Sequence, residues 1–321
     1  MSKNKTALAV AIGAAVALTS FASQAEITVL KQDPQAGNPL SRLNFTVGGS
    51  IRPQFQNMTG DDGKNGYKRN GFDGGTRFRF AADYYLFDDI SWVSYYELGV
   101  NIPAQFNWDN HYADGAHDTS RRMLYTGLKS DTWGTLTFGQ QNSVYYDVVG
   151  AKTDIWDYDM IGQASGNGIN GDYDGSYRSR KMLKYKKTIG DANIYASYLF
   201  ADSTYLANDG MRYKRKGGGS LGVDYNLTTD LTWGAAWNYT RAEMRNPGNG
   251  DSKAYDQNIL GTALSWTPEQ WTFSLGGGWY QNFMTTKKTD VNHYFAGDAW
   301  GIEYFAGYKF PIGQYAVKSI Q

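Results

Sequence analysis

Cysteine is absent from this chain of 321 residues, which excludes a disulfide framework and thiolate chemistry. Histidine is scarce, because the only imidazoles are those of His111, His117 and His293. All three fall in predicted loops, none follows a recognisable nucleophile motif, and no H-E-x-x-H sequence occurs. These absences argue against an enzyme, and we expect neither a metal site nor a cofactor.

Net charge and long apolar runs are also missing. The chain has 31 basic and 31 acidic residues, and such a balance argues against a nucleic-acid partner. Beyond residue 25, no window offers the roughly eighteen apolar residues that a membrane helix requires. Proline is rare, with 7 residues, so few strands would be interrupted by it.

The amino terminus has the three-part layout of a secretory signal peptide. Lys3 and Lys5 precede an apolar run from Ala7 to Leu18, and a small-residue cleavage site ends at Ala25. We therefore expect residues 1–25 to be removed and residues 26–321 to form the folded protein. A membrane anchor is the alternative, which the alanines of the run, the threonines that flank it and the cleavage site disfavour.

What the sequence does contain is alternation. From Leu43 to Gln321, about thirteen stretches of about ten residues alternate apolar with polar side chains. Strands of nine to eleven tilted residues cross the roughly 30 Å hydrocarbon core, and alternation places one row against lipid and the other against a wet lumen. Trp233 and Trp237 thus share one face of the segment 231–239. Aromatic residues, at 16% of the chain, suit the two membrane interfaces. The pattern predicts an all-β protein, a transmembrane antiparallel β-barrel.

The connections between these stretches alternate short with long. The short ones, expected to be periplasmic turns, are Asp88-Asp89, Asp131–Trp133, Thr188–Asp191, Thr228–Asp230, Thr267–Gln270 and Pro311–Gly313. The long polar segments, expected to be extracellular loops, are Asn57–Gly75, Pro103–Ser120, Asn142–Gly175, Ala201–Gly210, Ala242–Asp256 and Asn282–Ala296. A connection as long as Asn142–Gly175 is usually functional, and folded inward it would narrow the pore.

The segment from Arg122 to Asp147 reads RMLYTGLKSDTWGTLTFGQQNSVYYD and continues as VVGAKTD to Asp154. It resembles a strand, turn, strand and loop onset of the general diffusion porins of Gram-negative outer membranes. Those proteins carry R-L-A-F-A-G-L-K, G-S-F-D-Y-G-R-N and V-V-Y-D-A-L-G-Y-T-D-M. The match has no gap through Asp147, and one inserted residue separates it from Thr153-Asp154. Weaker similarity covers much of the remaining mature chain.

This resemblance implies a homotrimer of sixteen-stranded barrels in the cell outer membrane, in contact with its lipid and lipopolysaccharide. It implies passive diffusion of small hydrophilic solutes and ions through a neck where loop acids face wall arginines. Position by position, Arg77 and Arg122 correspond to two wall arginines, and Asp154 corresponds to the first loop acid. Arginine also alternates with phenylalanine in the segment 77–80, which predicts Arg77 and Arg79 on the wet face.

The loop and the wall depart from the family pattern at two places. The family's L-P-E-F-G-G-D is replaced by Trp156–Gly162, so the second acid falls on Tyr158, and we expect Asp157 or Asp159 to substitute for it. The third wall arginine would fall near Asn170. Its candidate replacements stand on the next strand and are Arg178 and Arg180.

The carboxyl terminus also departs from the pattern. Family members close the barrel with a strand that finishes in phenylalanine, whereas this chain stops at Gln321, part-way into the expected thirteenth strand. About three strands would be missing, and an open edge in lipid leaves unpaired backbone groups. We therefore expect a truncated sequence, with a non-functional product as one alternative.

Two further functions are compatible with the sequence. A substrate-selective oligosaccharide channel is one, because Trp156, Tyr158 and Tyr173 of the long loop would offer ring surfaces to sugars. A structural or adhesive barrel is the other. Single-channel conductance with and without sugars separates them, since saturable block implies selectivity and ohmic flow implies general diffusion.

Overall fold

The structure, a computed structural model, describes residues 26–33, 35, 37–57, 68–102, 119–155, 160–286 and 288–309. Several sequence predictions lie outside these ranges, among them the leader 1–25, the two acids Asp157 and Asp159, and the turn Pro311–Gly313. In the described part of the chain, no helix is long and apolar enough to cross a membrane.

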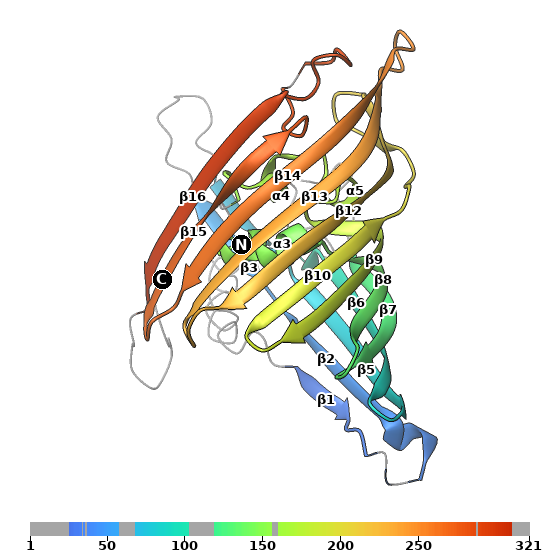
Figure 1. The fold of residues 1–321 in the computed structure, drawn as a ribbon. Coiled ribbons are helices and arrows are strands. Elements are labelled where there is room, and N and C mark those ends of the chain that lie inside the picture. The colour runs from blue at the N-terminus through green and yellow to red at the C-terminus, as the bar shows by residue number, and fades with distance from the viewer. Residues whose placement is uncertain are drawn as a thin grey trace, which may run out of the picture. The chain divides into compact units, whose positions relative to one another are not determined.

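Antiparallel strands dominate the described residues (Figure 1). They form a 14-stranded sheet in the order β1-β2-β5-β6-β7-β8-β9-β10-β12-β13-β14-β15-β16, with β11 paired to β12 off this path. A separate hairpin joins β3 to β4. The strands of the large sheet are β1 Ile27–Leu30, β2 Leu43–Ser50, β5 Arg77–Phe87, β6 Ile90–Val100, β7 Thr119–Ser130, β8 Gly134–Asn142, β9 Arg178–Ile189, β10 Ala192–Leu199, β11 Tyr205–Leu206, β12 Arg212–Asn226, β13 Leu231–Arg245, β14 Ser252–Trp266, β15 Trp271–Gln281 and β16 Asp298–Tyr308.

The remaining elements are short. The hairpin consists of β3 Pro53–Asn57 and β4 Lys68–Asp73, and the helical turn η2 covers Pro39–Arg42. Between β8 and β9 lie the helices α3 Val144–Val148, η4 Gly150–Lys152, α4 Ala164–Asn167 and α5 Gly171–Asp174. The long connection predicted at Asn142–Gly175 is therefore a run of helical turns.

The chain divides into two compact units. The first consists of Met1–Tyr85, Val93–Leu124 and Pro311–Ile320, and the second consists of Leu86–Trp92, Tyr125–Phe310 and Gln321. The arginines expected on the wall at 77, 79 and 122 belong to the first unit, whereas the long loop belongs to the second.

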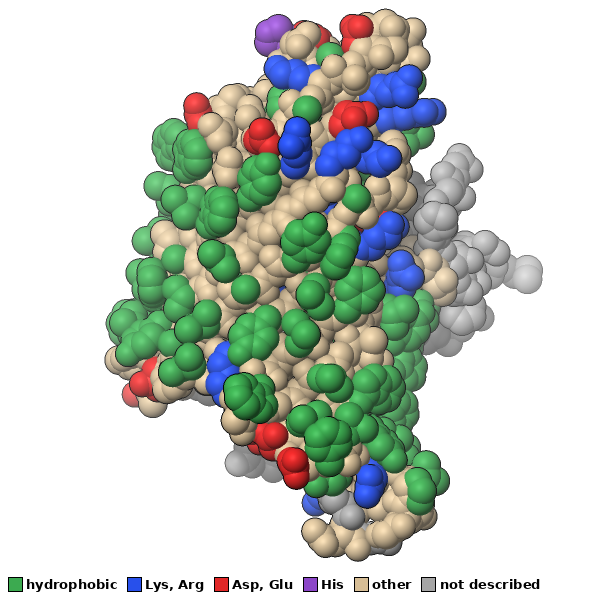
Figure 2. All heavy atoms as spheres, turned by 45° about the vertical axis from the view of Figure 1, so that its right-hand side comes forward, with side chains coloured by type: hydrophobic (Ala, Val, Ile, Leu, Met, Phe, Trp, Pro, Cys, Tyr) green, Lys and Arg blue, Asp and Glu red, His purple; other side chains and the backbone are tan. Residues whose placement is uncertain are grey.

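In the second unit, the sheet has two chemically different faces. Along β13 the even-numbered residues from Gly234 to Met244 are buried, whereas the odd-numbered ones are exposed or half-buried. We call the buried side the loop face, because α3 packs against β10, β12, β13 and β14 there, and the other side the outer face. Figure 2 shows hydrophobic side chains spread over the middle of the outer face. Its exposed members include Leu221, Trp237, Leu260, Leu264, Leu275, Trp279, Trp300 and Ile302, which confirms the predicted alternation.

The structure corrects the sequence predictions at several places, and one of them is the loop predicted at Ala201–Gly210, which contains β11. The loop predicted at Ala242–Asp256 is wrong in extent, because β13 runs to Arg245 and β14 begins at Ser252. Alternation continues there, since Ala242, Met244 and Tyr255 are buried in one cluster with Tyr213 and Phe295. Strand β1, which pairs with β2, was not expected, and β4 lies inside the loop predicted at Asn57–Gly75.

Candidate functional site

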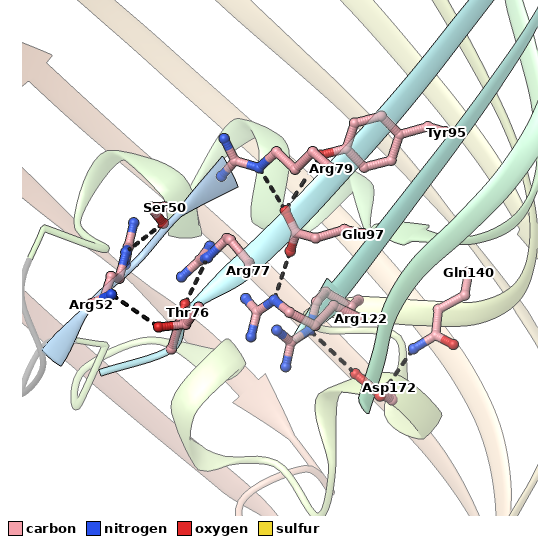
Figure 3. Close-up of polar contacts among 12 residues, drawn as sticks. Ser50, Arg52, Thr76, Arg77, Arg79, Tyr95, Glu97, Arg122, Gln140 and Asp172 are labelled. Carbon is pink, nitrogen blue, oxygen red and sulfur yellow. Dashed lines mark hydrogen bonds and ion pairs between the residues drawn. The ribbon is translucent and has the colours of Figure 1, made fainter. Parts of the chain in front are cut away.

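Two arginines converge on one buried carboxylate in the first unit (Figure 3). Glu97 of β6 is 1% exposed. Its Oε2 accepts a hydrogen bond from Arg79 Nε at 2.9 Å, and its Oε1 accepts one from Arg122 Nε at 2.6 Å. The Tyr95 hydroxyl donates to Oε2 at 3.3 Å. A single acid on the middle strand thus orients the guanidinium groups of β5 and β7.

Arg52 and Arg77 extend this group of cations. Arg77 Nε donates to the Gly75 carbonyl at 3.1 Å, and Arg52 Nε donates to Ser50 Oγ at 3.0 Å. Arg77 lies within electrostatic range of all the other members of the group (Figure 3). Four guanidinium groups and one carboxylate leave an excess of three positive charges. We call this group, Arg52, Arg77, Arg79, Glu97 and Arg122, the arginine row.

Strand alternation explains how the arginine row forms. Phe78 is 37% exposed, whereas its neighbour Arg79 turns towards Glu97, as expected of adjacent residues on opposite faces. Phe80 stacks with Tyr96 at 6.2 Å between ring centroids. The rings of β5 and β6 therefore meet on one face, and the charges of the same two strands meet on the other.

The long loop of the second unit lies flat against the loop face of its sheet. Helix α3 is capped by Ser143, whose Oγ accepts a hydrogen bond from the Tyr146 N–H at 3.0 Å. Val144, Tyr145 and Val148 of this helix are fully buried. The chain then continues through η4, and Figure 1 shows α3 behind β12, β13 and β14.

Two ion pairs hold this first part of the loop to the strands. Lys184 Nζ of β9 lies 2.7 Å from Asp147 Oδ2, and Lys152 Nζ lies 2.7 Å from Asp224 Oδ1 of β12. Lys152 also donates to Thr232 Oγ1 at 3.2 Å. The lysine and aspartate side chains are at most a quarter exposed, so solvent screens these pairs less than surface pairs.

The last part of the loop is fastened by a buried arginine. Arg215 of β12 is 0% exposed and donates to the carbonyl oxygens of Phe200 at 2.9 Å and Tyr173 at 2.7 Å, and to that of Arg180. Asp202 supplies the counter-charge, with Oδ2 at 3.7 Å from Arg215 Nη2. Helix α5 is thereby joined to the strand wall through its own backbone.

Burial and nearby donors shift the pKa values of two aspartates in this region, Asp174 and Asp202. Desolvation raises the pKa of Asp174, which is completely buried in the last loop turn, although the Ser176 and Asn170 N–H groups oppose the rise. Desolvation also acts on Asp202, but the Ser203 N–H together with Lys181, Arg180 and Arg215 lowers its pKa below the ordinary value. Asp202 is therefore held as an anion, as the counter-ion of Arg215 requires.

The predicted loop acid and one candidate arginine are connected through two rings. The Tyr146 hydroxyl donates to Asp154 Oδ2, and the Tyr146 ring meets the Tyr177 ring edge-to-face at 4.5 Å. The Arg178 guanidinium lies 4.4 Å above the Tyr177 ring centroid, and its Nε lies 3.7 Å from Asp172 Oδ1. Desolvation raises the pKa of Tyr146, so this hydroxyl remains a donor to Asp154.

Arg180, which was predicted as a wall arginine, is held by an acid and a ring of the second unit. Its Nε lies 3.1 Å from Asp202 Oδ2, and its guanidinium lies 4.5 Å above the Tyr173 ring centroid. The Tyr173 ring in turn packs against Tyr205 at 4.9 Å. Tyr173 is thus engaged by protein groups, which disfavours the sugar-stacking role considered for it; Trp156 and Tyr158 lie outside the described residues.

Sequence reasoning missed Glu97 and Arg52 in the first unit and Asp172, Asp202 and Arg215 in the second. Glu97 carried a usable signal, because it is the single acid in the otherwise uncharged strand β6. Among the described residues, no group of His, Cys, Asp and Glu has the arrangement of a metal site.

The arrangement of the strands agrees with the comparisons with known proteins. The sequence profile of the Gram-negative porin family matches residues 7–317. The chain belongs to this family. It is a Gram-negative porin by family, as the sequence resemblance predicted.

Three curated relatives of this porin share about a quarter of its residues. Outer membrane protein F of Serratia marcescens is 24% identical over 282 residues, or 81% of this chain and 67% of that protein. Outer membrane protein YedS of Escherichia coli is 23% identical over 214 residues, or 65% of this chain and 56% of that protein. Outer membrane porin C 2 of Shigella flexneri serotype 5a is 25% identical over 271 residues, or 79% of this chain and 66% of that protein. The chain thus spans between about half and two thirds of their lengths.

A solved structure supports the fold. The outer membrane channel DcaP of Acinetobacter baumannii superposes with a TM-score of 0.52 at 13% identity, covering 84% of this chain and 68% of DcaP. The predicted fold class, an antiparallel porin β-barrel, is therefore confirmed. The sheet path holds thirteen strands, but one of them is the unexpected β1, and the predicted thirteenth strand near Gln321 lies outside the described residues.

Proposed function

We propose that this porin is a water-filled channel for passive diffusion of small hydrophilic solutes and ions, filtered by charge at a neck. The arginine row carries this proposal. Glu97 fixes two of its guanidinium groups while leaving each about a fifth exposed, at 20% for Arg79 and 19% for Arg122. Arginine keeps its charge at every relevant pH, and such charge in a wet pore selects among ions.

The acids of this filter would come from the long loop. We propose Asp154 as one of them, with Asp157 and Asp159 in the segment that follows it. Arg178 remains a candidate for the neck, because its Nε lies 3.7 Å from Oδ1 of Asp172, in the last helical turn of the long loop. For Arg180 we propose a supporting role instead, since its guanidinium is engaged by Asp202 and by the Tyr173 ring.

The test is ion selectivity in planar bilayers. Replacing Arg122 by Ala removes one positive charge from the arginine row, so the reversal potential in a potassium chloride gradient should move towards cation preference. Arg241→Ala is the matched control, because Arg241 is exposed on the outer face of β13. An Arg122→Ala channel with the selectivity of the control would reject the proposed neck.

We further propose that the porin is exported through its leader 1–25, forms a homotrimer, and contacts outer-membrane lipid and lipopolysaccharide. A group of exposed cations supports the last partner. Lys and Arg side chains gather at the end of the outer face where β12 begins and β13 ends (Figure 2). We call this group the basic patch, and it comprises Arg212, Lys214, Lys216, Arg241 and Arg245. Cross-linking of the purified protein tests the trimer.

A further inference from the structure

Every strand from β12 to β16 places one glycine directly beneath the long loop. A Cβ atom on any of them would fall within 2.6 Å of a loop atom, which is far inside van der Waals contact. Val144, Tyr145, Val148, Gly162 and Gln163 supply these loop atoms. The five glycines are Gly222, Gly234, Gly261, Gly276 and Gly301.

Cross-strand pairing gathers these glycines into two adjacent rows of small residues. The first row runs through Gly222, Ala236, Gly261, Gly278 and Gly301, which pair directly from strand to strand. The second row runs through Gly234, Ala263 and Gly276. We call the two rows the small-residue seat. Ala236 and Ala263 are 3% and 2% exposed, so the loop covers the seat closely.

A carboxylate closes each end of the second row, and both carboxylates bind the loop. Asp224 pairs with Gly234 across β12 and β13, and its Oδ1 receives Lys152 Nζ at 2.7 Å. Glu303 pairs with Gly276 across β15 and β16, and its Oε2 accepts the Gly162 N–H at 2.9 Å. The loop is therefore held at two points with small residues between them.

We infer that the small-residue seat sets how far the loop projects from the wall, and that its glycines are positioning residues that determine pore width. The inference rests on the proposed diffusion function. Larger side chains would push away from the wall the loop residues that lie on the seat, which precede the Lys152 contact or adjoin the Gly162 contact. Because every ångström of lift narrows the water path, the seat acts on solute size independently of the charged residues.

Gly234 and Gly222 differ in the kind of loop atom that an added Cβ would meet, which is a backbone atom at Gly234 and a side-chain atom at Gly222. At Gly234 a Cβ would lie 2.2 Å from the Val148 carbonyl oxygen, so the loop backbone itself must move by about 0.8 Å or more to reach a tolerable contact. At Gly222 the obstruction under 3.0 Å is Val144 Cγ1 at 2.6 Å. Shortening Val144 should therefore relieve the second substitution and leave the first unrelieved.

The experiment compares Gly234→Ala, Gly222→Ala and Gly222→Ala/Val144→Ala with the wild-type full chain. Gly217→Ala is the matched control, because it lies in β12 and a Cβ there meets nothing closer than 3.7 Å. Single-channel conductance and the exclusion size for polyethylene glycols report pore width. Hydrogen exchange of residues 143–155 in detergent reports how the loop is seated.

We expect Gly234→Ala and Gly222→Ala to lower conductance, on the order of twofold, with faster exchange in residues 143–155. The Val144→Ala change should restore the Gly222 variant, and Gly217→Ala should resemble the wild type. Seat variants that match Gly217→Ala in both conductance and exchange would overturn the inference. If the wild type conducts no ions, the proposed function fails, while the exchange data still decide whether the glycines seat the loop.

Discussion

At the scale of single residues, Glu97 decides how much positive charge the arginine row presents. It is the only carboxylate in that group, and it accepts hydrogen bonds from Arg79 and Arg122. A charge-assisted pair of this kind fixes guanidinium geometry while neutralising part of its field. Its removal by an isosteric amide should therefore leave the shape of the wall nearly intact and raise its charge.

The variant Glu97→Gln is accordingly expected to increase anion preference, seen as a shift of the reversal potential in a salt gradient. Glu243→Gln is its control, because Glu243 pairs with Lys216 at 2.8 Å among exposed residues of the outer face. A shift towards cations, or an equal shift in both variants, would show that Glu97 does not face the ion path.

The sequence reached only part of this residue-level picture. Arg77 and Arg122 were found through family resemblance, and Arg79 was found through alternation. Glu97 was missed because its role depends on partners from two other strands, Arg79 being 18 and Arg122 being 25 positions away. Arg52 was missed because it follows β2 outside the regular strand pattern.

At the scale of secondary-structure elements, Arg215 joins three segments that are distant in sequence. Its side chain satisfies carbonyl groups of the β9 strand, the α5 helix and the residue after β10. Truncation would leave these three carbonyls without a donor, although Asp202 would keep Arg180 and Lys181 as partners. A buried hydrogen-bonding group left without a partner typically costs about 1–3 kcal/mol, and three such carbonyls add up to several kcal/mol.

We therefore expect Arg215→Ala to lower the free energy of unfolding by about 3–5 kcal/mol in denaturant titrations of the detergent-solubilised protein, mainly through the three carbonyls left without a donor. Arg212→Ala lies three positions earlier on β12 and is exposed, so its change should stay within about 0.5 kcal/mol. Equal effects from the two substitutions would show that the buried clamp contributes little.

A second contact between elements, made by the Asp89 carboxylate, depends on pH. Asp89, in the turn between β5 and β6, accepts hydrogen bonds from Ser130 Oγ and the Thr132 N–H, both at 2.7 Å. These bonds lower the pKa of Asp89 to about 2 from its ordinary value of 3.8. Because the folded pKa is the lower one, the stabilisation is complete above about pH 4 and is lost as the pH falls through 2.

Asp89→Asn should thus unfold at a lower temperature than the wild type at pH 6, and the difference should shrink between pH 4 and pH 2. Asp88→Asn, in the same turn, serves as the control. A melting difference that persists unchanged at pH 2 would mean that the carboxylate charge is not what the two donors recognise.

The sequence predicted most elements through alternation but not the loop. The five short turns within the described residues all separate consecutive strands, because turn residues interrupt a period of two in a recognisable way. The helical turns between β8 and β9 have no such period, since their contacts come from glycines on five remote strands. Met244 and Tyr255 were assigned to a loop because polar neighbours concealed their continuing alternation.

At the scale of the whole molecule, the outer face of the second unit combines two chemistries. Its middle carries exposed Trp and Leu side chains suited to lipid, and the end where β12 begins and β13 ends carries the basic patch (Figure 2). Trp237 and Tyr239 stack between the two zones at 6.5 Å, where amphipathic rings suit a membrane interface. This order matches an outer leaflet whose phosphates lie above its acyl chains.

The basic patch retains a positive excess after its own acids are counted. Lys216 pairs with Glu243 at 2.8 Å, and the Tyr239 hydroxyl binds Asp256, the cross-strand partner of Arg241. Glu243 also lies within electrostatic range of Lys214 and Arg245. Five cations against two carboxylates leave three charges to attract phosphate groups.

Arg241→Ala should therefore weaken binding of lipopolysaccharide to the detergent-solubilised porin about fivefold, since each cation near an anionic surface contributes about 1 kcal/mol. Lys288→Ala is the control, because Lys288 is exposed in the loop between β15 and β16 and outside the patch. Dephosphorylated lipopolysaccharide should erase the difference between Arg241→Ala and the wild type, and added salt should reduce it. If neither dephosphorylation nor salt changes the affinity, the acyl chains make the contact with the apolar zone. The cations would then serve only solubility.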